Sequence, residues 1–104
     1  MIYEQRVYRL KNGTLNEYLR LIGDEGIAIQ RRHLGNLIGY FFTEIGPLNE
    51  ITHIWSFEDY EDRNKRRAQL AADPEWIAFL PKIAGLIEEG SNKFLKPSAF
   101  SPLA

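Results

Sequence analysis

An α+β fold of the ferredoxin-like type is predicted, in which helices cover one face of an antiparallel four-stranded sheet. The strand-like and helical segments follow one another in the order β-α-β-β-α-β, with the last helical part divided in two, which is the pattern of that fold. The 104 residues suffice for one domain and are too few for two. The middle strands are apolar on both faces, so we also expect a second layer over the face without helices.

The first strand and the turn after it occupy residues 2–13. Residues 2–10 read as a strand whose even positions share one face and whose odd positions share the other. A Lys-Asn-Gly turn follows, and Gly13 has the conformational freedom that such a turn needs. We therefore expect the chain to turn here and to begin a helix.

A long first helix is predicted between Thr14 and about Leu34. Thr14 fits the N-cap position, and Glu17, three residues later, would complete a capping box. Gly23 and Gly26 interrupt the apolar stripe of this helix. Each glycine costs about 1 kcal/mol relative to alanine in a helix interior, so a kink or a close packing contact is expected there.

A hairpin of two strands is predicted over residues 37–45 and 51–57. The first of these strands is apolar on both faces, with Phe41 on one face and Ile38 on the other. The second strand is mostly apolar, and His53 interrupts it. Such strands need cover on both sides.

Residues 59–97 are predicted to hold two helical segments and the last strand. A helix over residues 59–72 is followed by Asp73 and a proline, which is a favourable start for another helix. Pro81 is expected to kink or restart this last helix, which would end near Gly90. The final strand is predicted at residues 92–97.

The composition excludes several classes of function. There is no cysteine, and the two histidines lie far apart in the sequence, so no metal and no cofactor are predicted. The net charge of −1 gives no basic field for nucleic acid or an anionic membrane. No apolar stretch approaches the roughly 20 residues of a membrane span, and the N-terminus does not resemble a signal peptide. We expect one cytoplasmic domain over residues 1–104, with a tail at residues 97–104.

A homodimer is predicted from the strands that are apolar on both faces. The helices suffice to cover one face of the sheet, and a second copy packed sheet against sheet would cover the other. Burial of a large aromatic side chain stabilises by about 1.5–3 kcal/mol, whereas several exposed ones would favour aggregation. A ligand over part of the same face is the alternative cover.

Five side chains are predicted to converge on one face of the sheet. The first and third strands are neighbours in a ferredoxin-like sheet, so Glu4, Arg6 and Tyr8 can share a face with His53 and Trp55. Ligand sites have this character, with a few polar groups that converge over an apolar floor. We therefore predict that these residues bind a small apolar or aromatic molecule.

His53 is the candidate catalytic residue of this group. As a general base it would need a pKa near neutrality, and Arg6 or Tyr8 would then stabilise an enolate-like anion. The alternative is a hydrogen-bonded core or interface histidine. On that alternative, Glu4 and Arg6 form an interface ion pair and the aromatic residues belong to the core.

The arginines of the second helical segment are candidates for the mouth of the site. Pairs four residues apart, Asp59 with Arg63 and Asp62 with Arg66, would each add a few tenths of a kcal/mol to the helix. An arginine of this run, Arg63 or Arg67, is alternatively placed to cover a pocket and bind an anion.

With these residues identified, the chain resembles the NIPSNAP family over nearly its whole length. The matching stretches are YEQRVYRLKNG, GNLIGYFFTEIGPLNEITHIWSFEDYEDRNKRR and LAADPEWIAFLPKI. The resemblance implies ferredoxin-like subunits paired sheet to sheet, as in the dimeric α+β barrel superfamily. The family pattern falls on the following residues of this chain: Glu4, Arg6, Tyr8, His53, Trp55, Arg63, Arg67, Asp73, Pro74 and Trp76.

The resemblance leaves three hypotheses for the function. The wider superfamily includes cofactor-independent monooxygenases, heme enzymes and small-molecule-binding proteins, and better-known NIPSNAP members are mitochondrial and tied to protein interactions. The chain is therefore predicted to bind a small molecule, with a monooxygenase- or isomerase-type enzyme as the first alternative. A protein-interaction module that uses Arg63, Arg66 and Arg67 is the second alternative.

Overall fold

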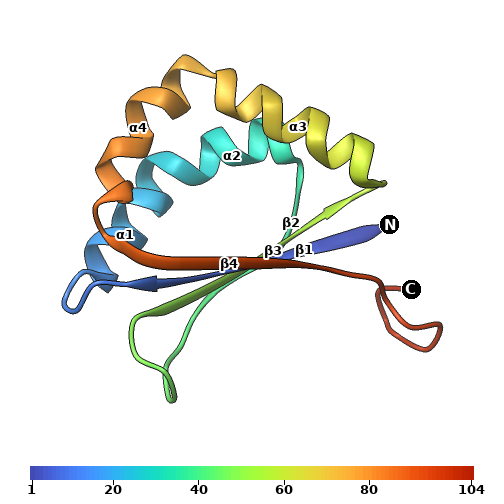
Figure 1. The fold of residues 1–104 in the computed structure, drawn as a ribbon, viewed down its shortest axis with the longest axis horizontal. Helices are drawn as coiled ribbons and strands as arrows, with labels where there is room; N and C mark the ends of the chain where they lie inside the picture. Colours follow the sequence, from blue (N-terminus) through green and yellow to red (C-terminus); the bar gives the residue numbers. More distant parts are fainter.

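The computed structural model describes residues 1–104 and places all the helices on one face of a single sheet (Figure 1). No helix of the chain is both long enough and apolar enough to cross a membrane. The elements, in chain order, are β1 (Ile2–Leu10), α1 (Leu15–Leu21), the π-helical turn η1 (Ile22–Gly26), α2 (Ile27–Leu34), β2 (Asn36–Phe42), β3 (Glu50–Phe57), α3 (Tyr60–Ala72), α4 (Pro74–Ala84) and β4 (Ile87–Leu95).

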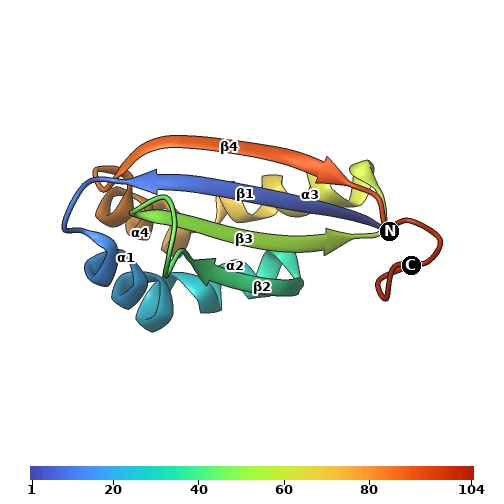
Figure 2. The same ribbon diagram turned by 90° about the horizontal axis from the view of Figure 1, so that it is seen from below.

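The sheet confirms the predicted ferredoxin-like topology. Its strand order is β2-β3-β1-β4, which Figure 2 shows from below, and every neighbouring pair is antiparallel. In this register Arg6 of β1 pairs with His53 on one side and with Asn92 on the other. The middle of β1 is therefore the point where three strands present side chains together to the helices.

The first helical segment departs from an ideal α-helix at its glycines, as predicted. The turn η1 separates α1 from α2, and a Cβ on Gly26 would lie 2.7 Å from the Phe79 ring of α4. The absence of a side chain at this position thus allows α4 to approach closely. The predicted capping box is wrong, because the Thr14 hydroxyl donates to the Lys11 carbonyl instead of receiving a helix N–H.

The strand β2 ends at Phe42, so the predicted extension to residue 45 is wrong. An irregularity between Leu37 and Gly39 shifts the register against β3, and Ile38 lies with Tyr3 and Ile54 on the face away from the helices. The prediction assumed strict alternation along this strand, and it therefore put Ile38 and Phe41 on opposite faces of the sheet. After the irregularity, alternation resumes with a changed phase.

The part of the chain after β3 also differs from the prediction in its boundaries. The aspartates at the two helix starts act as N-caps, since Asp59 accepts from the Asp62 N–H and Asp73 from the Glu75 N–H. The helix α4 continues through Pro81 without a restart and ends at Ala84, where the Leu86 N–H returns to the Ile83 carbonyl. The strand β4 thus begins at Ile87, five residues earlier than predicted.

The core lies between the helices and the sheet and consists of buried apolar and aromatic side chains. Its largest fully buried members are Trp55, Tyr18 and Phe57. The opposite face of the sheet is partly apolar and less covered, with Ile38 41% exposed and Phe41 55% exposed. Residues of the C-terminal tail cover part of that face, where the Tyr3 hydroxyl donates to the Leu103 carbonyl at 3.0 Å.

Candidate functional site

A fully buried carboxylate forms the centre of the candidate site. Glu4 Oε2 accepts hydrogen bonds from Arg6 Nη1 at 2.9 Å, from Arg63 Nη2 at 2.8 Å and from Asn92 Nδ2 at 2.8 Å. Arg67 Nη2 lies 3.5 Å from Glu4 Oε1 as an ion pair without hydrogen-bond geometry. These residues, Glu4, Arg6, Arg63, Arg67 and Asn92, are called the Glu4 cluster below.

The local sequence explains how the Glu4 cluster forms. Glu4 and Arg6 are two residues apart on β1, so their side chains share the face toward the helices. Arg63 and Arg67 are four residues apart on α3, so both reach down from the same side of that helix. Asn92 is brought in by β4, where it pairs with Arg6.

The Glu4 cluster carries more positive than negative charge. Three guanidinium groups surround one carboxylate, which leaves two positive charges uncompensated within the cluster. Burial alone would raise the pKa of Glu4, but hydrogen bonds from Arg63 and Asn92, together with the charges of the other two arginines, lower it from 4.5 to about 2. The carboxylate is therefore ionised throughout the physiological pH range.

His53 lies beside this cluster with one ring nitrogen bonded and the other unpartnered. Its side chain is 1% exposed, and Trp55 Nε1 donates to His53 Nδ1 at 2.8 Å. An indole N–H is a donor only, so Nδ1 carries the lone pair and the proton of the neutral ring is on Nε2. His53 Nε2 is buried and has no hydrogen-bond partner.

The environment of His53 keeps its ring neutral. Burial is the main cause that lowers the pKa from 6.5 to about 3, and the positive charges of Arg6 and Arg67 lower it further. The expectation of a pKa near neutrality is wrong for this reason. At neutral pH the unpartnered Nε2–H is a hydrogen-bond donor, and it is not available as a general base.

Two aromatic rings pack directly against the imidazole. The Tyr40 ring stacks on His53 at 4.5 Å between centroids, and the Tyr8 ring meets it edge-on at 5.2 Å. The Tyr40 and Tyr18 hydroxyls lie 2.6 Å apart, and burial raises the pKa of both phenols. The Tyr8 hydroxyl accepts from Arg6 Nε at 2.9 Å, which joins the aromatic wall to the Glu4 cluster.

Arg67 supplies two further buried groups without partners, Nε and Nη2. Burial is the main cause that lowers the pKa of Arg67 to about 10, and the charge of Arg6 adds to it. At the edge of the site, the Arg63 guanidinium lies 5.3 Å from the centroid of the Phe94 ring. Phe94 lies on β4 and is 38% exposed, so this edge of the site is only partly covered.

The structure brings all seven sequence-predicted site residues to this one region between the sheet and α3. The helix pairing was predicted only in part: Asp62 binds Arg66 at 2.8 Å, but Arg63 binds Glu4 in place of Asp59. Sequence reasoning missed three contributors, and only the spacing of Tyr18 in its helix hinted at an inward position. The missed residues are Tyr18, Tyr40 and Asn92.

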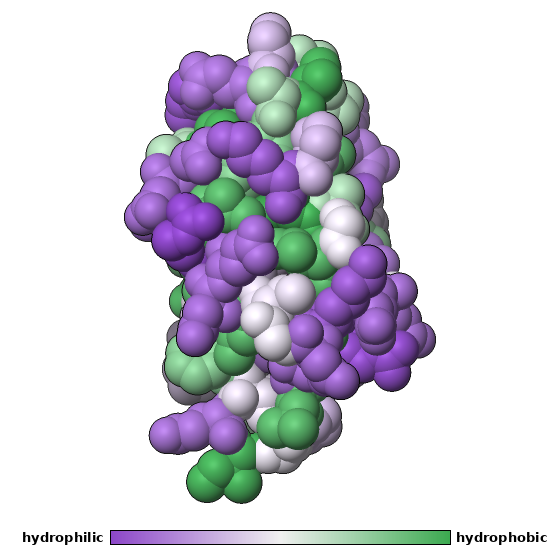
Figure 3. Space-filling model, turned by 90° about the vertical axis from the view of Figure 1, so that its left-hand side faces the viewer, coloured by the Kyte–Doolittle hydropathy of each residue, from purple (hydrophilic) through white to green (hydrophobic).

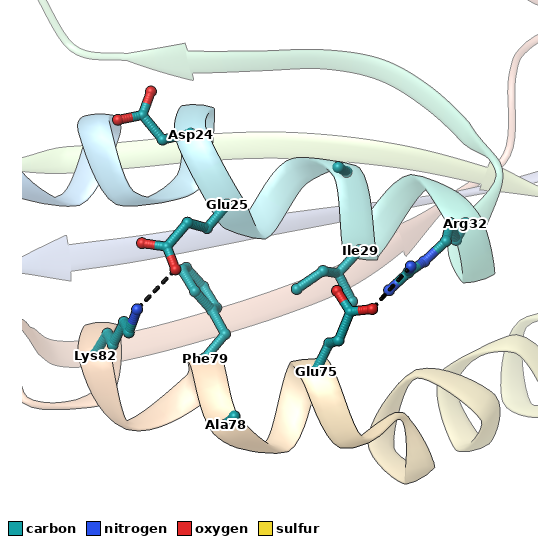
Figure 4. Close-up of a pocket in the computed structure, with 9 residues that line it drawn as sticks. Asp24, Glu25, Ile29, Arg32, Glu75, Ala78, Phe79 and Lys82 are labelled. Atoms are coloured by element: carbon teal, nitrogen blue, oxygen red, sulfur yellow. Dashed lines mark hydrogen bonds and ion pairs between the residues drawn. The ribbon is translucent and has the colours of Figure 1, made fainter.

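A separate cleft of about 550 Å³ lies between α4 and the segment formed by η1 and α2 (Figure 4). It is bordered by exposed ion pairs, Lys82 with Glu25 at 2.7 Å and Arg32 with Glu75 at 3.3 Å. Ile29 and Phe79 line its apolar part. No member of the Glu4 cluster and neither ring of the His53–Trp55 pair lines this cleft, so it is distinct from the candidate site.

Comparison with known proteins decides the family. The NIPSNAP family profile matches residues 3–102. The chain belongs to the NIPSNAP family. The protein NipSnap of Drosophila melanogaster is 33% identical over 105 residues, which is 97% of this chain but 36% of the Drosophila protein. This NIPSNAP chain thus spans about a third of the length of that relative.

Solved structures extend the comparison to the fold. A NIPSNAP family protein of unknown function from Agrobacterium tumefaciens is 60% identical, with a TM-score of 0.98, and the match covers 100% of this chain and 94% of that one. A putative antibiotic biosynthesis monooxygenase from Nitrosomonas europaea has a TM-score of 0.68 at 8% identity, covering 93% of this chain and 98% of that one. The second likeness shows a shared fold.

Proposed function

We propose that this NIPSNAP chain binds a small apolar or aromatic molecule between the sheet and α3, and that it does so as a homodimer. The observation that carries the binding proposal is the buried, unpartnered Nε2–H of His53 among aromatic rings and beside the Glu4 cluster. Buried polar groups normally have partners, and exceptions concentrate at functional sites. Few polar groups over aromatic walls are also the usual composition of a ligand site.

Binding is tested by a thermal-shift screen of small aromatic molecules against the purified protein. A ligand at about 100 times its Kd stabilises by about 2.7 kcal/mol, which raises the Tm of a domain of this size by roughly 10–20 °C. The shift is expected to shrink in Arg67→Met and to persist in Arg66→Met, a change of the same kind one residue away. A screen in which every molecule stabilises both variants equally would contradict the site.

If the same site is catalytic, His53 would act in it as a hydrogen-bond donor and not as the general base that the sequence predicted. A neutral imidazole that donates from Nε2 can stabilise negative charge on a substrate, and a nearby guanidinium can do the same. The second candidate function is therefore an enzyme of the monooxygenase or isomerase kind in which His53 and Arg67 stabilise an anion. The proton acceptor of such an enzyme would be a group other than His53.

The interaction-module hypothesis has less support than ligand binding, because its proposed arginines make contacts within the fold. Arg63 and Arg67 point inward to Glu4, and Arg66 donates to the His33 carbonyl and to Asp62. These arginines hold α3 to the rest of the molecule. A partner that bound through Arg63 or Arg67 would have to break contacts with Glu4, whereas the Arg66 side chain is 40% exposed.

The homodimer proposal rests on the face of the sheet opposite the helices. Ile38, Phe41 and Leu95 expose apolar surface on or beside it. The β2–β3 loop projects below the sheet in Figure 1, and Figure 3 shows hydrophobic side chains exposed at that lower end. In this loop Ile45 is 93% exposed and Leu48 is 76% exposed. A second copy on a two-fold axis would cover both surfaces at once.

Phe41→Glu is expected to convert the dimer into a monomer, because it places a charge in the middle of the proposed apolar interface. The matched control is Ile77→Glu on α4, because Ile77 is 57% exposed and Phe41 is 55% exposed. Light scattering after size exclusion measures the mass. A wild-type monomer, or a dimer lost equally in both variants, would contradict the proposal.

A further inference from the structure

We infer that the ligand of this site carries an anionic oxygen, as a carboxylate, enolate or phenolate does, and that His53 Nε2–H and the unpartnered N–H groups of Arg67 hold that oxygen. The inference rests on the function proposed above and names the chemical class of its ligand. It follows from the kind of polar groups left unpartnered, from the balance of charge and from the position of these groups between the sheet and α3.

The unpartnered groups that His53 and Arg67 contribute are all donors. Arg67 Nε and Nη2 are buried without hydrogen-bond partners, as is His53 Nε2. A guanidinium has no acceptor atom, and the bond from Trp55 to Nδ1 fixes the imidazole proton on Nε2. A molecule that satisfies the three groups must therefore accept hydrogen bonds, and a second donor would be rejected.

The charge balance favours an anion over a neutral acceptor. The Glu4 cluster holds three positive charges and one negative charge, and Glu4 already accepts from Arg6, Arg63 and Asn92. Hydrogen bonds from a cation to an anion are shorter and stronger than those to a neutral amide or hydroxyl. An anionic oxygen would reduce the repulsion among the arginines, whereas a neutral oxygen would leave it unchanged.

The register places these donors around one region. Arg6 pairs directly with His53 across the sheet, and Glu4, the contact of Arg67, is the next residue on that face of β1. The aromatic rings of Tyr8 and Tyr40 flank His53. An acidic oxygen on an aromatic body would match this arrangement, with the oxygen toward the donors and the body toward the rings.

The test is a calorimetric comparison of three probes with the same aromatic body, 2-naphthoate, 2-naphthamide and 2-naphthylmethylamine, at neutral pH. The carboxylate is expected to bind about tenfold or more tightly than the amide, and the amine is expected to bind most weakly. Arg67→Met and His53→Phe should each reduce the preference for the carboxylate. Arg66→Met should retain it, and His53→Gln, which keeps a side-chain donor, should retain part of it.

The possible failures are distinguishable. If the wild-type protein binds the carboxylate and the amide equally, the inference is overturned and the proposed binding function stands. If it binds none of the probes and no molecule of the wider screen, the proposed function fails and the inference fails with it. A carboxylate preference that persists in Arg67→Met would place the anion elsewhere. Should His53→Phe not fold, the probe series and Arg67→Met decide the question without it.

Discussion

Glu4→Gln is expected to destabilise the protein by about 3–5 kcal/mol, the usual cost of removing one partner from a buried ion pair. Glutamine has nearly the same shape, but it supplies no charge to the three guanidinium groups that now surround the carboxylate. Urea unfolding at one fixed protein concentration measures the loss, because a dimer makes the midpoint depend on concentration. Glu17→Gln on the exposed side of α1 is the control and should change little.

A second substitution separates charge repulsion from lost hydrogen bonding. If repulsion among the arginines dominates, Arg67→Met should cost less in the Glu4→Gln background than in the wild type, because it then removes an uncompensated charge. A double variant that is destabilised by the sum of the two single changes would show that the charges do not interact. A Glu4→Gln variant as stable as the wild type would contradict the described cluster.

Acid is expected to destabilise the protein in two stages, the first of which comes from His53. The pKa of His53 is lowered from 6.5 to about 3, so below pH 6.5 the unfolded chain binds a proton that the fold does not bind. Stability should fall by about 1.4 kcal/mol per pH unit, or about 2–3 kcal/mol between pH 6.5 and 4.5. Above pH 6.5 this group contributes no pH dependence.

The second stage comes from Glu4, whose pKa is lowered from 4.5 to about 2. Its contribution to stability is complete above pH 4.5 and is lost as the pH falls toward 2. His53→Phe should remove the first stage and leave the second. The comparison is between slopes of stability against pH, since the substitution also changes stability at neutral pH. Ile83→Val, a mild core change, should keep both stages, and a wild-type slope near zero between pH 6.5 and 4.5 would contradict the buried neutral imidazole.

The convergence of the site could be predicted from the sequence where simple periodicity holds. Alternation along β1 and β3 places Arg6 and His53 on one face, and the ferredoxin-like order makes these strands neighbours. The spacing of Arg63 and Arg67 likewise places them together on α3. In these cases a local rule and a known topology suffice.

The rest of the site depends on features that no local rule supplies. Tyr40 reaches His53 because the strand β2 has an irregularity after Leu37, which changes the phase of alternation. Asn92 reaches Glu4 because β4 begins at Ile87, at a position where the predicted helix was still expected to continue. The pKa of His53 follows from burial and from charges on two other elements, which are properties of the tertiary structure.

The protonation of the His53 ring is the first property to measure, by nitrogen-15 NMR of histidine-labelled protein at neutral pH with and without 2-naphthoate. The expected spectrum shows a neutral His53 with its proton on Nε2, and the Nε2–H resonance shifts when the carboxylate is added and shifts less at the same concentration of the amide. Three results would contradict the claim that His53 Nε2–H donates to an anionic oxygen of the ligand. They are a doubly protonated ring, a proton on Nδ1, and an Nε2–H resonance that no small molecule moves.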